Sequence, residues 1–175
     1  MLLRHGELCI RNAEPRDAAR LAAWWNDGRV MAHAGFPLGL GVSEEEVAKQ
    51  LASGREESGR VLLIAYQDRP IGEMNYRNLG DGTAEIGIKI CESAFQNRGL
   101  GRALLSLLIR ALFERGYSRI VLDTNLKNVR AQHVYELLGF EKLRVNENSW
   151  RDQLGESQSS VDYALTPDRF RDHAR

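Results

Sequence analysis

The sequence predicts an α/β fold of the α+β kind, with one mixed, mostly antiparallel central sheet of six to seven strands flanked by about four helices. Residues 61–90 contain three apolar segments separated by short turns, which is typical of an antiparallel meander. Residues 83–123 read strand, long helix and strand, which is typical of a right-handed parallel crossover. The 175 residues, 43% of them hydrophobic, predict a single domain over residues 1–175 with a substantial core.

The chain ahead of the meander predicts one strand and two helices. Residues 8–11 suit a short strand, and Pro15 suits the first turn of a helix that ends near residues 26–28. Residues 30–41 are rich in glycine and proline and predict an irregular loop. Ser43 and Glu46 have the spacing of a capping box, so a second helix begins there and stops near residue 54.

The meander is expected to have strands at residues 61–66, 71–76 and 83–90. Helical periodicity then runs over residues 100–112, and a further strand follows at residues 120–123. Past it, a short helix is expected to end at Gly139. The last part of the chain predicts a strand at 140–145, a polar excursion at 146–159 with a lone Trp150, a strand at 160–165, and a charged tail at 167–175 that frays.

Two glycines lie where the predicted long helix begins, in the segment Gln96-Asn97-Arg98-Gly99-Leu100-Gly101-Arg102. The first N–H groups of a helix have no intrahelical partner, and the helix dipole adds positive charge there. Glycine lets a ligand approach the backbone, and the two arginines add full charges. The segment therefore favours a phosphate or diphosphate. It lacks the Gly-Lys-Ser/Thr of a P-loop, and Leu104 replaces the third glycine of a dinucleotide fingerprint.

Composition limits the function classes. The formal net charge is zero, which argues against a nucleic-acid partner. No apolar run reaches membrane-spanning length, so no membrane partner is expected. Two cysteines far apart, Cys9 and Cys91, indicate neither a disulfide framework nor a metal site. A reducing cytoplasmic location is the expectation.

Four features follow one another along the chain: the strand at residues 85–90, the motif Gln96-x-x-Gly99-x-Gly101, the strand at residues 120–122, and Asn128-x-x-Ala131-x-x-x-Tyr135-x-x-x-Gly139-Phe140. In this order they resemble the GCN5-related N-acetyltransferase (GNAT) superfamily. Independently of the family, Asn128 and Tyr135 are two helical turns apart and share one face. Trp24-Trp25-Asn26-Asp27, followed by Val30, resembles the subgroup of ribosomal-protein N-terminal, spermidine and aminoglycoside acetyltransferases.

The resemblance implies a cleft between splayed strands that holds acetyl-CoA as co-substrate, with no metal. It implies direct acetyl transfer to a primary amine in a ternary complex, and a homodimer is possible. The implied cofactor-binding residues are Ile88, Ile90, Gln96, Asn97, Arg98, Gly99, Leu100, Gly101, Arg102, Asn128, Ala131 and Tyr135. Tyr135 would also protonate the leaving thiolate, and an N–H near Ile88 would stabilise the oxyanion. For Tyr135 the alternative is a helix aromatic that packs in the core.

The general base and the acceptor stay open. Glu85 is the first candidate base and Glu73 the second, with an acceptor-binding role also possible for Glu73; either could instead be a cross-strand partner of a basic residue. Trp24 and Trp25 would wall the acceptor pocket or simply fill the core. The acceptor could be a peptide N-terminus, a polyamine, an amino sugar or an amino-acid-like amine. A longer acyl-CoA, an oxygen nucleophile and a non-catalytic acyl-CoA-binding module are the alternatives.

Overall fold

The computed structural model describes residues 1–174. Within this range one eight-stranded sheet has the order β1-β2-β3-β4-β5-β6-β8-β7, and only the β5–β6 pair is parallel. The strands are β1 Leu2–His5, β2 Leu8–Asn12, β3 Gly59–Tyr66, β4 Arg69–Gly80, β5 Thr83–Ile90, β6 Arg119–Asn125, β7 Glu141–Arg151 and β8 Ser157–Leu165. The α-helices are α1 Ala18–Trp25, α2 Gly28–Met31, α3 Glu44–Ser53, α4 Leu100–Glu114 and α5 Val129–Leu137. The predicted fold class is confirmed, although strands and helices are slightly more numerous than expected.

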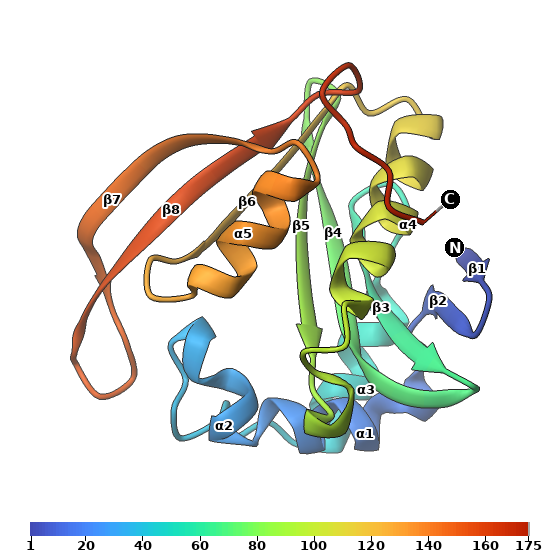
Figure 1. Ribbon diagram of the computed structural model, residues 1–175. Coiled ribbons are helices and arrows are strands. Elements are labelled where there is room, and N and C mark those ends of the chain that lie inside the picture. Colours follow the sequence, from blue (N-terminus) through green and yellow to red (C-terminus); the bar gives the residue numbers. More distant parts are fainter. Residues whose placement is uncertain (175) are drawn as a thin grey trace.

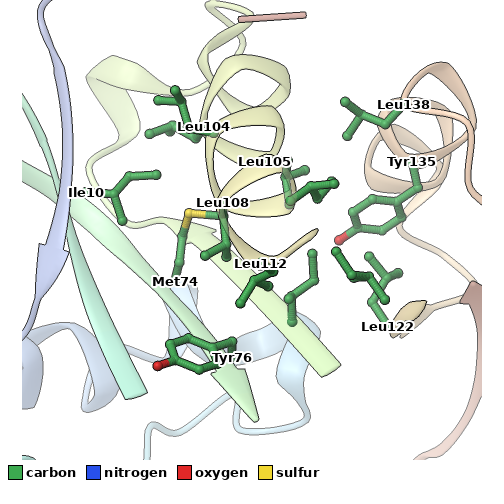
Figure 2. Close-up of a cluster of buried hydrophobic side chains, with 14 of the residues drawn as sticks. Ile10, Met74, Tyr76, Leu104, Leu105, Leu108, Leu112, Leu122, Tyr135 and Leu138 are labelled. Atoms are coloured by element: carbon green, nitrogen blue, oxygen red, sulfur yellow. The ribbon is translucent and has the colours of Figure 1, made fainter. Parts of the chain in front are cut away.

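Helices cover the two faces of the sheet separately (Figure 1). The helices α4 and α5 pack on one face, where the main core contains Leu105, Leu108 and Leu122 (Figure 2). The helices α1 and α3 pack on the other face over a second apolar cluster that includes Leu21 and Leu63. Alternation along the strands sends even-numbered side chains of β5 and β6 to the α4 face and odd-numbered ones to the opposite face.

Two local predictions before the C-terminal tail were wrong, and one strand was not predicted. The segment 146–159 is largely strand, because β7 extends to Arg151 and β8 starts at Ser157. Most of β7 is exposed on the sheet edge, so its sequence lacks the apolar alternation of a half-buried strand. The loop at residues 30–41 contains the end of α2 and a 3-10 turn, η2 (Ala32–Ala34). The additional strand β1 forms a hairpin with β2.

The C-terminal tail does not fray within the described residues. The Arg171 N–H donates to the Leu138 carbonyl at 2.9 Å, and the His173 N–H donates to Ser106 Oγ at 3.0 Å. The rings of Phe113 and Phe170 are in edge contact, with centroids 5.9 Å apart. An apolar anchor with paired backbone groups therefore outweighs the charged composition that suggested fraying.

The parallel pair β5–β6 is short. Its register covers only Thr83↔Arg119, Ala84↔Ile120 and Glu85↔Val121, although β5 continues to Ile90 and β6 to Asn125. The two strands thus diverge after three residue pairs and leave an opening within the sheet.

Candidate functional site

A cleft of about 710 Å³ occupies the opening between β5 and β6. One wall is residues 86–90 of β5, and the other is residues 123–125 of β6. Residues 96–102 and the first turns of α5 close one end, while α2, η2 and Trp150 close the other. The predicted splayed strands and the predicted glycine segment therefore belong to one site.

The β5 wall presents unpaired backbone groups to the cleft. The Cys91 N–H donates to the Ile71 carbonyl on the β4 side, and the Arg119 N–H donates to the Gly82 carbonyl on the β6 side. Because these directions alternate along a strand, the N–H and C=O groups of residues 88 and 90 point toward β6, which has moved away. Gln96 Nε2 donates to the Ile90 carbonyl at 2.8 Å, whereas Ile88 has no strand partner on this side.

The glycine segment forms the basic end of the cleft. Gly99, with φ +76°, is the N-cap residue of α4, and a Cβ on Gly101 would meet no atom within 4 Å. Arg98 and Arg102 line the cleft beside these glycines. Arg130 of α5 donates to the Asn97 side chain, so a third arginine joins this end. An open helix N-terminus with three guanidinium groups suits a diphosphate.

The helix α5 contributes the predicted Asn128 and Tyr135. Asn128 caps the helix, because its Oδ1 accepts the Ala131 N–H at 3.3 Å. Tyr135 is 7% exposed and packs against the rings of Phe140 and Tyr163. Figure 2 shows it reaching from α5 toward Leu122 of β6. Burial, and secondarily the negative charge of Asp123, raises the pKa of Tyr135 to about 12.

Asp123 is a cleft residue that the sequence patterns did not single out. It lies on β6 just beyond the last β5–β6 pair, and its side chain stays accessible from the cleft. Partial desolvation of its carboxylate raises the pKa of Asp123, and the charges of Glu85 and Asp162 raise it further. The available signal was an acidic residue directly after the apolar strand residues 120–122.

The two predicted bases are paired with basic residues. Glu85 forms an ion pair with Arg77 at 2.6 Å, and Glu73, only 3% exposed, forms one with Lys89 at 3.0 Å. Neither glutamate is among the residues that line the cleft, although Lys89 is. Their roles in catalysis or acceptor binding remain predictions.

The two predicted acceptor tryptophans lie at the end of α1 and are not among the residues that line the cleft. Trp24 and Trp25 are buried in the second apolar cluster, and Trp24 Nε1 donates to Glu92 Oε1 at 3.0 Å. The cleft is lined by Trp150 instead, together with Arg29, Val30 and His33. These four cleft residues are brought together by tertiary contacts between segments that are distant in the sequence.

Residues 1–174 contain no cluster of metal-binding side chains and no helix long and apolar enough to cross a membrane. Diverging strands beside a glycine-capped helix define the fold class of the acyl-CoA-dependent acetyltransferases. The chain belongs to the GNAT acetyltransferase family, since residues 7–141 match the family described as "Acetyltransferase (GNAT) domain".

Known relatives agree with this family. A ribosomal protein bS18-alanine N-acetyltransferase of Haemophilus ducreyi is 32% identical over 74 residues, which are 42% of this chain and 51% of that protein. The matched segments span 17% to 51% of the lengths of the curated relatives.

Two solved structures share the fold. RimL, a ribosomal L7/L12 α-N-protein acetyltransferase in complex with coenzyme A, superposes with a TM-score of 0.84 at 18% identity, over 97% of this chain and 99% of that one. The spermidine N-acetyltransferase of Vibrio cholerae, in complex with CoA and spermine, gives 0.83 at 19% identity, over 94% and 98%. At these identities the likeness concerns the fold.

Proposed function

We propose that the protein transfers the acetyl group of acetyl-CoA directly to a primary amine within a ternary complex. The observation that carries this proposal is the opening between β5 and β6, which has an anion-binding helix start at one end and an accessible carboxylate, Asp123, on the opposite wall. Cys91 offers no covalent route, since it is buried and burial raises the pKa of its thiol to about 12.

The backbone N–H groups of residues 96–102 hold the diphosphate of the co-substrate in this proposal. The backbone of Ile88 and Ile90, with Asn128 and Ala131, lies along its pantetheine arm. Acetyl-CoA supplies the thioester whose acetyl group moves. Two features support this placement of acetyl-CoA. The edge of β5 beyond Glu85 has no strand partner, and a Cβ built on Gly101 would meet no atom within 4 Å.

Two side chains of the protein, Asp123 and Tyr135, carry out the proton transfers in this proposal. Asp123 accepts a proton from the acceptor ammonium, so the neutral amine can attack the thioester carbonyl. The Ile88 N–H donates to the oxyanion that forms, and Tyr135 gives its proton to the departing thiolate. The attacking nitrogen then loses its second proton, and this proton returns Tyr135 to its neutral form. Asp123 is favoured over Glu85 and Glu73 because it lines the cleft and no ion pair or hydrogen bond joins its carboxylate to another residue within residues 1–174.

The two groups reach the opening from opposite faces of the sheet. Tyr135 belongs to the core on the α4 face, while odd-numbered Asp123 projects to the opposite face, which α1 and α3 cover. Co-substrate and acceptor therefore approach from opposite sides and meet between the strands. This arrangement suits direct transfer, in which the rate gain comes from placement of two bound reactants.

A thiol-release assay over a panel of amines tests the proposal, with calorimetry for acetyl-CoA, CoA and a longer acyl-CoA. Micromolar binding of acetyl-CoA and amine-dependent thiol release are expected. Binding without thiol release from any amine would point to an acyl-CoA sensor. Preference for the longer thioester would point to another acyl donor, and no binding of any CoA species would refute the assignment.

A further inference from the structure

The far end of the β7–β8 hairpin docks on the loop that follows α2. Gln153 makes three hydrogen bonds to that loop: its N–H donates to the Gly35 carbonyl at 2.8 Å, its Nε2 donates to the Gly39 carbonyl at 3.0 Å, and its Oε1 accepts the Leu38 N–H at 2.9 Å. Figure 1 shows the hairpin end curling toward α2. One side chain thus satisfies two backbone groups of a segment far away in sequence.

The indole ring of Trp150 rests on Gly35. A Cβ on Gly35 would lie 2.4 Å from Trp150 Cζ3, and the φ of Gly35 is +93°. Both the space and the backbone conformation at this position therefore require glycine. The contact fixes how far the ring can move toward the loop.

The register of the sheet places Trp150 on the same face as Asp123. Trp150 pairs with Gln158 across the hairpin, and Gln158 Oε1 accepts from Asn125 Nδ2 at 3.2 Å. Asn125 is two residues from Asp123, so the side chains of all four residues project from one face. Trp150 and Asp123 both line the cleft.

From this arrangement, and resting on the proposed function, we infer that Trp150 determines acceptor specificity. Held by Gly35 and Gln153, the ring limits the width of the acceptor at the end of the cleft that α2 and η2 close. The site accepts a primary amine at the end of a slender, unbranched chain and rejects an amine carried on a bulky ring. A rigid indole suits this role because it has few rotamers and a large surface.

The first test compares the wild-type protein with Trp150→Ala and Trp150→Phe. Thiol release is measured with an alanine-initiated peptide, spermidine and an amino sugar. Trp150→Ala should raise kcat/KM for the amino sugar, relative to the better slender amine, by roughly tenfold or more. The affinity for CoA, measured by calorimetry, should stay unchanged. Trp150→Phe should fall between the two.

The second test uses two matched glycine variants. Gly35→Ala should displace the ring and shift the acceptor ranking in the same direction as Trp150→Ala. Gly41→Ala is the control, because Gly41 also has a positive φ of +70° but a Cβ there would meet no atom within 4 Å. Gln153→Ala should raise the acceptor KM with little change in kcat, since it loosens the ring's support.

The outcomes of these tests distinguish a failure of the specificity role of Trp150 from a failure of the proposed function. If the wild-type protein releases thiol but the acceptor ranking is unchanged in Trp150→Ala, the specificity role is refuted and the acetyltransferase assignment stands. If Gly35→Ala and Gly41→Ala shift the ranking equally, the contact with the ring is irrelevant and the inference again fails. If the wild-type protein releases no thiol with any amine, the proposed function fails and the specificity role falls with it.

Discussion

The negative charge of Asp123 on β6 helps to keep the phenol of Tyr135 on α5 protonated. Burial is the larger cause, and together the two effects raise the pKa of Tyr135 to about 12. Asp123 has a raised pKa as well, from partial desolvation and from the nearby charges of Glu85 and Asp162. The cleft thus pairs a carboxylate with increased basicity and a phenol that retains its proton, which is the division that acid–base catalysis requires.

Asp123→Asn should lower kcat by about 10²-fold or more, because the amide cannot accept the proton of the acceptor. The affinity for acetyl-CoA, measured by calorimetry, should change little. In the wild-type protein the rate should fall on the acid side as pH drops through the raised pKa of Asp123. Glu85→Gln and Glu73→Gln are the comparison variants, and a larger loss in either would transfer the role of base to it.

Asp123→Asn should also raise the free energy of unfolding at neutral pH. A carboxyl group with a raised folded-state pKa binds more protons in the folded than in the unfolded chain, so its ionisation destabilises the fold as pH rises above 3.8. The neutral amide removes this effect. Thermal unfolding at pH 7 and at pH 3 measures it: the gain should appear at pH 7 and vanish at pH 3. An equal gain at both pH values would contradict the electrostatic explanation.

Tyr135→Phe should lower kcat by about 10²-fold while the affinity for CoA is kept, because only the hydroxyl is lost. The aromatic contacts with Phe140 and Tyr163 survive this change, so unfolding should be little affected. Since the pKa of Tyr135 is about 12, the wild-type rate should show no decline from Tyr135 ionisation below about pH 10. Steady-state rates across pH check both statements, and an unchanged kcat would remove Tyr135 from the mechanism.

Gly101→Asp should weaken CoA binding by roughly tenfold or more, because the carboxylate repels the diphosphate. A Cβ at this position meets no atom within 4 Å, and an acidic residue near a helix start does not destabilise the helix. Calorimetry with CoA and thermal unfolding separate binding from folding. Gly101→Asn is the matched neutral control; equal losses in the two variants would indicate a steric effect instead.

Glu56, which is not a cleft residue, should contribute to the free energy of unfolding, and this contribution should be lost at acid pH. Its pKa is lowered from 4.5 to about 2, chiefly by the hydrogen bond from Asn12, with Arg115 and the Met1 ammonium contributing. This stabilisation is present above pH 4.5 and is lost as pH falls toward 2. Because the carboxylate is 36% exposed, Glu56→Gln should cost only about 1 kcal/mol at pH 7. Denaturant unfolding at pH 7 and pH 3 checks this, with Glu57→Gln as control.

The sequence predicted best those parts of the site that are formed by residues close together in the chain. Periodicity identified β5 and α4, and the spacing of Asn128 and Tyr135 placed both on α5 beside the cleft. Trp150 could not be assigned in this way, since its position depends on contacts with Gly35 that no local pattern encodes. Asp123 was missed because its accessibility comes from strand divergence, a property of two segments together.

The part of β7 that carries Trp150 was also not predicted as a strand from the sequence. An edge strand exposed on both faces has no reason to alternate polar and apolar residues, so β7 resembled an irregular excursion. The resemblance proposed Trp24 and Trp25 as acceptor residues; their side chains lie in the second apolar cluster, and an acceptor role for them remains a prediction.

Three residue pairs join β5 to β6, so the two parts of the sheet meet at a short hinge. Without a ligand, the amide proton of Ile88 has no strand partner to slow its exchange with deuterium. A ligand that contacts both open strand edges connects the two parts of the sheet beyond these three residue pairs. The sheet is then fully connected only when the ligand is bound, and the ligand becomes one of its structural components.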